Sequence, residues 1–264
     1  MIETDLLTWM LDYYRVFALT AMRIGVFLFM MPVFSSRTIP GRVKAAATLV
    51  IATVLTPVVP YTPDQLPENP LEFALMAAAE VFIGMTLALI IRLIFGGLQL
   101  AGQMIGFQMG FSVANIVDPG SGTQSTIIVQ MAYMIALLLF LASNGHLMIL
   151  QTVYESFSLL APGELNLHQS LSDLILETGQ EMFVLSVKLM APVMAILLFS
   201  QVALGILAKT VPQINLLIMS FGLNIALGLF FFGLSLQLFW PVFAKALNRG
   251  IKLVPVAMKI MSGG

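Results

Sequence analysis

Four long stretches of this chain contain no Asp, Glu, Lys or Arg. They are residues 45–63, 93–117, 119–154 and 210–244. About 20 apolar residues are enough to cross the hydrocarbon core of a bilayer as a helix. The strands of a membrane barrel would instead alternate in polarity over segments of about ten residues. The pattern therefore predicts an all-α integral membrane protein.

Composition supports this class and excludes others. The 264 residues are 59% hydrophobic and 9% charged, whereas soluble domains carry roughly 25% charged residues. The net charge of −1 gives no general basis for binding nucleic acid. The absence of cysteine excludes disulfides and thiolate chemistry. The two histidines are far apart in sequence, so no histidine metal cluster is expected. No cofactor is expected either.

The apolar runs predict the helical segments and their breaks. The segment from residue 71 to 117 would be roughly 70 Å long as one helix, so we expect its glycines near residue 96 to bend or break it. An acidic loop is expected over residues 155–181, and a tight break at 209–213. The expected helical segments are residues 6–31, 43–59, 71–117, 126–157, 182–208 and 214–240.

Four charged residues lie inside apolar segments and are expected to be buried: Arg23, Glu80, Arg92 and Lys188. Charges within membrane segments are rare, and they pair with one another or mark functional sites. Arg23 is expected to snorkel or to pair with another helix, with a functional role as the alternative. Glu80, Arg92 and Lys188 could pair with one another or with partner proteins.

Cations in the loops predict the topology of the chain in the membrane. Arg37, Arg42 and Lys44 indicate a cytoplasmic loop, because cytoplasmic loops are enriched in Lys and Arg. Lys209 indicates the same side for its loop, and so do the cations of the tail, residues 241–264. One crossing between them cannot satisfy both assignments. We interpret this conflict as a sign that partner subunits cover much of the chain.

A glycine-rich segment is the first motif that could carry function. Gly102, Gly106 and Gly110 are four residues apart, so they share one helix face and allow another backbone to approach closely. Glutamine and methionine lie between them. A close seam between two helices is one interpretation. A flexible constriction is the other, because methionine is long, unbranched and adaptable.

The second and third motifs are turns. Asp118, Pro119, Gly120 and Ser121 form a strong turn signal between two apolar segments. Irregular backbone at membrane depth is tolerated only where it is buried in protein or lines a cavity. The Pro212-Gln213 turn that follows Lys209 is less specific, and a hairpin cap would explain it.

In combination and order, these motifs resemble the FliR family of export-gate subunits of type III secretion systems. The resemblance rests on residues 36–44, 106–112, 117–121, 140–147 and 212–215, and it extends over nearly the whole chain. It implies long, bent helical hairpins with a FliP-like part over residues 1–181 and a FliQ-like hairpin over 182–240. The motifs do not separate a flagellar from a virulence system, although the resemblance favours the flagellum.

The resemblance also implies partners and a location. One copy of the chain would assemble with FliP and FliQ homologues, near FlhB and FlhA, in the bacterial inner membrane at the flagellar basal body. Unfolded flagellar subunits would be the cargo. Lipid would cover part of the surface, and the loop contacts to other subunits would come from Arg37, Arg42, Lys44, Lys209, Pro212 and Gln213.

The loop over residues 106–122 resembles the family's plug, which projects into the closed channel. A plug without charged side chains at its seal would close a pore by packing and would not attract ions. The expected seal residues are Met104, Phe107, Met109 and Phe111, with Gln108 between them. Gly106, Gly110 and Gly120 are the expected hinges. Asp118, Pro119 and Ser121 are expected in the closed turn.

Two other classes of protein remain as alternatives. A secondary transporter of small solutes would show two similar halves with broken helices at matching positions, and no clear repeat is visible. An intramembrane enzyme would need a clustered polar site. The chain has no phosphate-binding loop, HExxH or GxSxG motif, so we expect no enzymatic activity.

Overall fold

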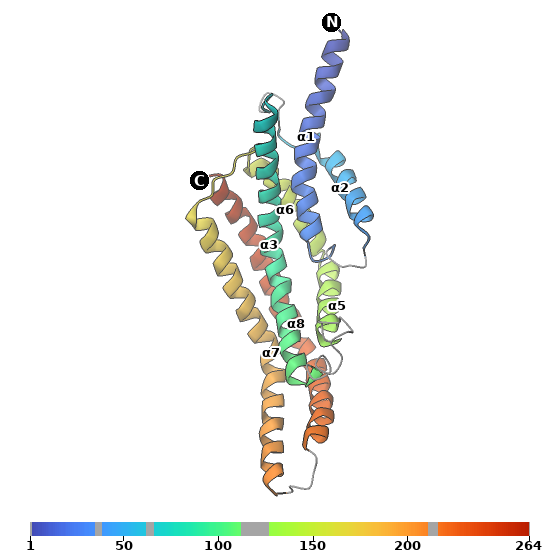
Figure 1. Ribbon diagram of the computed structural model, residues 1–264, viewed down its shortest axis with the longest axis vertical. Coiled ribbons are helices and arrows are strands. Elements are labelled where there is room, and N and C mark those ends of the chain that lie inside the picture. Colours follow the sequence, from blue (N-terminus) through green and yellow to red (C-terminus); the bar gives the residue numbers. More distant parts are fainter. Residues whose placement is uncertain (1, 35–38, 62–65, 112–126, 211–215, 264) are drawn as a thin grey trace. The chain divides into compact units, whose positions relative to one another are not determined.

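The computed structural model describes residues 2–34, 39–61, 66–111, 127–210 and 216–263. Every regular element within these ranges is an α-helix, as the apolar runs predicted. Figure 1 shows the helices in chain order. They are α1 (Ile2–Met30), α2 (Gly41–Leu55), α3 (Pro70–Gln108), α5 (Ile127–Ala142), α6 (Gly145–Leu159), α7 (Gln169–Thr210) and α8 (Leu216–Met261).

Four of the described helices are long and apolar enough to cross a membrane: α1, α3, α7 and α8. The pair α5 and α6 is bent by 68° and would add a fifth span if the two count as one. Asn144 lies at this bend with a φ of 57°, a left-handed conformation that asparagine adopts more readily than most residues. The prediction of one helix over residues 126–157 is therefore wrong at its centre.

Three further expected boundaries are wrong, and in each case the observed helix continues past the expected boundary. The α3 helix passes through Gly96 and Gly97 without a break, because these glycines face another helix. The acidic residues Asp173, Glu177 and Glu181 lie in α7, which begins at Gln169. The last helix continues to Met261 through most of the residues expected to form a tail.

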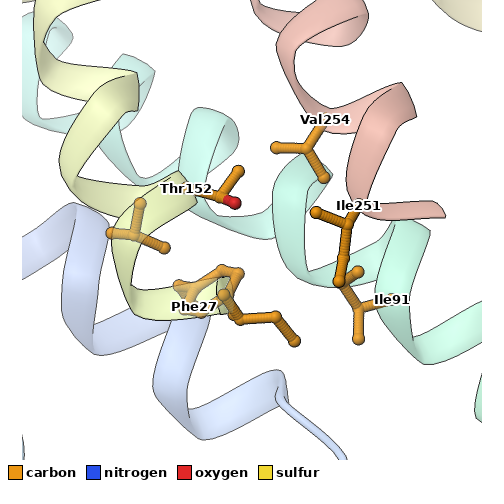
Figure 2. Close-up of a pocket in the computed structure, with 7 residues that line it drawn as sticks. Phe27, Ile91, Thr152, Ile251 and Val254 are labelled. Carbon is orange, nitrogen blue, oxygen red and sulfur yellow. The ribbon is translucent and has the colours of Figure 1, made fainter. Parts of the chain in front are cut away.

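The chain divides into two compact units. Unit 1 consists of Met1–Leu93, Asn144–Thr178 and Asn248–Gly264. Its helix α1 packs against α2, and Gly25 permits this, since a Cβ there would lie 3.1 Å from a methyl group of Thr48. Figure 2 shows Ile251 and Val254 of α8 facing Phe27 and Thr152 around a small cavity of about 10 Å³. The end of α8 thus belongs to the core of unit 1.

Unit 2 consists of Ile94–Ser143 and Gly179–Leu247. Its aromatic core centres on Phe95, whose ring makes edge contacts with Tyr133, Phe140 and Phe243 at centroid distances of 5.3–6.1 Å. A polar contact joins α7 to α8, where the buried Ser200 hydroxyl donates to Asn224 Oδ1 at 3.1 Å. Unit 2 therefore has a mainly apolar interior with isolated polar contacts.

Candidate functional site

The C-terminal end of α3 is closed onto α8 by a methionine. The side chain of Met109 is fully buried, and it lies directly over Gly228. A Cβ at Gly228 would come within 2.5 Å of Met109 Cγ and 2.7 Å of its sulfur. No other residue type fits at position 228 without displacing this methionine. Met109 thus packs directly against the backbone of Gly228.

Gly110 completes this contact. Its φ of 95° lies in the region that favours glycine, and the chain turns there as α3 ends. A Cβ at this position would lie 3.1 Å from the Phe221 ring of α8. Met109 and Gly110, which directly follow α3, and Phe221 and Gly228 of α8 are called the methionine seat below.

Two glycines of α3 allow close contacts with two other helices of unit 2. A Cβ at Gly102 would lie 3.0 Å from the Cα of Val129 in α5. A Cβ at Gly97 would lie 2.7 Å from the carbonyl oxygen of Met182 in α7. Both approaches are to backbone, which cannot move aside as a side chain can. Glycine at these positions therefore lets the helices pack closely, as small residues do in membrane bundles.

The expected seal residues do not share one environment. Met109 is fully buried, while Met104 is 44% and Phe107 is 65% exposed in this chain. Gln108 and Phe111 are half-buried, and Gly106 is buried. The expected turn residues Asp118, Pro119, Gly120 and Ser121 lie outside the described residues. The structure thus brings Met109 and Gly110 to α8 and leaves Met104 and Phe107 on the surface of the isolated chain.

Unit 1 contains a buried ion pair between α1 and α3. Arg23 and Glu80 are both fully buried. The guanidinium donates through Nε to Glu80 Oε2 at 2.5 Å and through Nη2 to Oε1 at 2.9 Å. This parallel, two-bond geometry is the strongest form of an arginine–carboxylate contact. Of the alternatives for Arg23, pairing with another helix is the one that the structure shows.

The remaining polar atoms of the pair are also bonded. Arg23 Nη1 donates to the carbonyl oxygen of Ser156 at 2.9 Å and to its hydroxyl at 3.1 Å. The amide of Gly163 donates to Glu80 Oε1 at 3.3 Å. The guanidinium carbon lies 4.4 Å from the centroid of the Phe157 ring. The pair therefore links α1, α3, α6 and the loop after α6.

Gly84 makes this pairing possible. It lies one helical turn after Glu80, and a Cβ there would come within 2.5 Å of the carbonyl oxygen of Arg23. Without a side chain at Gly84, the backbones of α1 and α3 approach closely enough for the carboxylate to reach the guanidinium. The ion pair and the glycine contact are thus one packing unit.

Tyr61 lies beside the ion pair. Its ring makes an edge contact with Phe157 at 5.7 Å, and its hydroxyl is buried without a hydrogen bond of normal geometry to any described residue. Burial raises the pKa of this hydroxyl, and the Arg23 charge opposes part of the rise. Tyr61 therefore stays neutral beside the pair.

Two of the four expected buried charges are not buried. Arg92 and Lys188 are exposed on the surface of this chain, so the expectation of burial is wrong for both. The apolar sequence around each residue suggested a buried position. In the structure, both side chains face away from the core of their unit. A charge on an outer face of an apolar helix requires water or a partner group outside the chain.

The loop residues expected to contact partners are only partly described. Arg42 and Lys209 are exposed and Lys44 is half-buried. Arg37, Pro212 and Gln213 lie outside the described residues. Among the described residues, no group of three His, Asp or Glu side chains could hold a metal ion.

Sequence reasoning missed the residues that complete both sites. Gly228 and Phe221 receive the end of α3, and Gly84, Ser156 and Tyr61 surround the ion pair. The signal for Gly228 was present as a glycine inside an apolar run, but several glycines in α8 share that signal. Only the packing distinguishes Gly228 from Gly222 and Gly233, which have open space around them.

Four helices that are long and apolar enough to cross a membrane, with every regular element of the described ranges helical, define the class as an all-helical membrane protein. Comparison with known sequences identifies its kind. The sequence profile of the family described as bacterial export proteins, family 1, matches residues 14–250. The chain therefore belongs to this family, that of the flagellar biosynthetic protein FliR.

Individual relatives agree with this assignment. The chain is 32% identical to flagellar biosynthetic protein FliR of Bacillus subtilis over 220 residues, which cover 82% of this chain and 84% of the relative. It is 30% identical to the FliR of Escherichia coli over 75% of each chain. It is 30% identical to that of Pectobacterium carotovorum over 92% of this chain and 90% of the relative. The chain is a membrane component of the flagellar export apparatus.

Proposed function

We propose that this chain is one subunit of the flagellar type III export gate. With FliP and FliQ homologues it forms a channel that passes unfolded flagellar subunits across the inner membrane at the basal body. FlhB and FlhA homologues are its neighbours there. Family membership supports the export role, and the exposed charges Arg92 and Lys188 support contact with further subunits or with water. The chain acts in this proposal as a structural gate without enzymatic activity.

The packing of the methionine seat is the main support for the proposed gate mechanism. The end of α3 leads directly into residues 112–122, which belong to the proposed plug. Met109 closes onto Gly228 by packing alone, with no charged group in the contact. Methionine has three rotatable side-chain bonds and adapts to irregular gaps. In the proposal, Met109 holds the base of the plug closed and yields when a chain passes.

The remaining plug residues have related roles in the proposal. The exposed side chains of Met104 and Phe107 meet the other subunits of the channel wall, together with Gln108 and Phe111. Gly106, Gly110 and Gly120 let the backbone swing aside. Asp118, Pro119 and Ser121 hold the closed turn. Residues 1–181 would be the FliP-like part and residues 182–240 the FliQ-like hairpin.

Native mass spectrometry of the affinity-tagged chain, co-expressed with its FliP-like and FliQ-like partners, tests the assembly. The proposal expects one defined complex that contains a single copy of this chain. A monomer or homodimer that retains neither partner in mild detergent would contradict the proposal. It would favour the alternative that the chain is a transporter of small solutes.

Conductance and secretion measurements test the plug. Deletion of residues 112–122 should raise the leak of small ions through the assembled complex in planar bilayers. Replacement of Gly106 or Gly110 by tryptophan should block secretion of flagellar subunits. Unchanged conductance after the deletion, together with unchanged secretion in both variants, would refute the plug.

A further inference from the structure

An apolar groove opens in unit 1 between α1, α2 and α6. Its volume is about 220 Å³, and all of its lining side chains are aliphatic or aromatic. Phe27 and Leu28 of α1, Val50 and Val54 of α2, and Leu150 and Val153 of α6 line it. Val50 and Val54 are more than 60% exposed in the isolated chain. The groove is therefore a hydrocarbon surface that no described part of this chain covers.

Water is a poor occupant for such a groove. An ordered water needs two to four polar partners, and purely apolar cavities of about 150 Å³ stay dry and accept hydrocarbon instead. An empty groove would lose the dispersion contacts of its lining. The groove belongs to a membrane protein, so the hydrocarbon at hand is a lipid acyl chain.

The charges of α2 indicate which lipid fits. Its sequence contains no acidic residue, and both of its cations lie in the first turn, where Arg42 is exposed and Lys44 is half-buried. The twelve residues from Arg42 to Val54 rise about 18 Å along a helix at 1.5 Å per residue. One leaflet contributes about 15 Å to the hydrocarbon core. A chain that ends beside Val54 thus has its headgroup level with these cations.

We propose that this groove binds one acyl chain of an anionic phospholipid, whose phosphate contacts Arg42 and Lys44. The guanidinium of Arg42 suits a phosphate because it can donate two parallel hydrogen bonds. Basic residues beside membrane helices on the cytoplasmic side bind anionic headgroups. The positive-inside rule puts the start of α2 on that side. The lipid joins α2, which at 15 residues is too short to span a bilayer, to α1 and α6.

Lipid retention by the purified full chain tests this inference. The detergent-solubilised chain would be stripped of lipid and titrated with phosphatidylglycerol or with phosphatidylcholine of the same acyl chains, and bound lipid would be counted by native mass spectrometry. Preferential binding of one phosphatidylglycerol is expected. The Arg42→Gln and Lys44→Gln variants should each weaken it about fivefold, and the double variant about thirtyfold. Equal binding of both lipids by the native chain would overturn the inference.

A second pair of variants separates the groove from the general lipid belt. Val50→Trp fills the groove and should abolish the specific binding. Leu49→Trp adds the same bulk to an exposed position of α2 that does not line the groove, and it should leave binding unchanged. Equal loss in both variants, or in neither, would contradict the proposal.

Photocrosslinking in the co-expressed complex examines the other occupant that could fill the groove, a helix of a neighbouring subunit. A benzophenone side chain at Val54 should form an adduct with phospholipid. An adduct mainly with a partner protein would overturn the lipid assignment. It would leave the proposed export gate intact, because a partner helix in the groove is compatible with assembly of that gate.

Discussion

Unit 1 and unit 2 each contain a close contact at a glycine, but the two contacts differ in chemistry. In unit 1, Gly84 brings α3 onto the backbone of Arg23, and the Arg23–Glu80 ion pair forms beside it. In unit 2, α8 has the glycine, and Met109 fills the space over Gly228 without a charged group.

The two contacts differ in how they respond to displacement. A buried ion pair is directional, and separating its partners leaves an uncompensated charge in an apolar interior. A methionine over a glycine loses only dispersion contacts, which decline gradually and can form again in another rotamer. The chain therefore has a rigid contact in unit 1 and a yielding contact at the base of the proposed plug.

The largest expected effect is the loss of one partner of the ion pair. Glu80→Ala leaves the Arg23 guanidinium buried and unpaired, so we expect a loss of about 3–5 kcal/mol in the free energy of unfolding. The midpoint of unfolding in mixed detergent and denaturant would measure it. Arg92→Gln is the control, because Arg92 is exposed, and it should change the midpoint little.

A double replacement sharpens this test. Arg23→Met combined with Glu80→Leu removes both charges and keeps much of the volume, so it should be much less destabilising than Glu80→Ala alone. If Glu80→Ala and Arg92→Gln changed stability equally, the pair would not be the rigid contact of unit 1.

The next effect concerns the methionine seat. In Gly228→Ala the new methyl group displaces Met109, and overpacking of this kind costs about 1–3 kcal/mol. The same variant should raise the ion leak of the assembled complex, measured as conductance in planar bilayers. Gly233→Ala provides a matched control on the same helix, since nothing lies within 4 Å of Gly233. Equal leak in the two variants would argue against closure by Met109.

A smaller effect is expected where α3 ends. Gly110→Ala places a Cβ on a residue with a φ of 95°, and a left-handed conformation costs about 1–2 kcal/mol for most residues. The unfolding midpoint should fall accordingly, and secretion should slow because the turn is strained. A midpoint equal to that of the native chain would show that this turn rearranges freely.

The smallest effect is expected at an exposed ion pair. Arg249 Nη2 lies 3.4 Å from Glu177 Oε1, and both side chains are more than half exposed. Exposed pairs contribute about 0–1 kcal/mol, so Arg249→Gln should hardly change the unfolding midpoint. A loss of stability as large as that of Glu80→Ala would mean that burial does not decide how much an ion pair contributes to the free energy of unfolding.

The sequence predicted the class of fold because apolar runs are a local property. The described parts of the four charge-free stretches lie mostly in α2, α3, α5, α6 and α8, and an all-helical membrane protein followed from their composition. Helix boundaries were less predictable. Gly96 and Gly97 suggest a break when α3 is considered alone, and they continue the helix because Met182 of α7 packs against them. The family resemblance from short motifs was confirmed by comparison with known sequences.

The tertiary structure alone decided which polar residues meet. Four charges in apolar segments looked equivalent in sequence, yet Arg23 and Glu80 are buried together while Arg92 and Lys188 face outward. The same holds for the glycines of α8, of which Gly228 receives Met109. Composition determines that a helix enters a membrane, because the free energy of moving apolar side chains from water into lipid adds up along the chain. Which faces pair depends on helix rotation and close approach between segments far apart in sequence, and no local pattern contains that information.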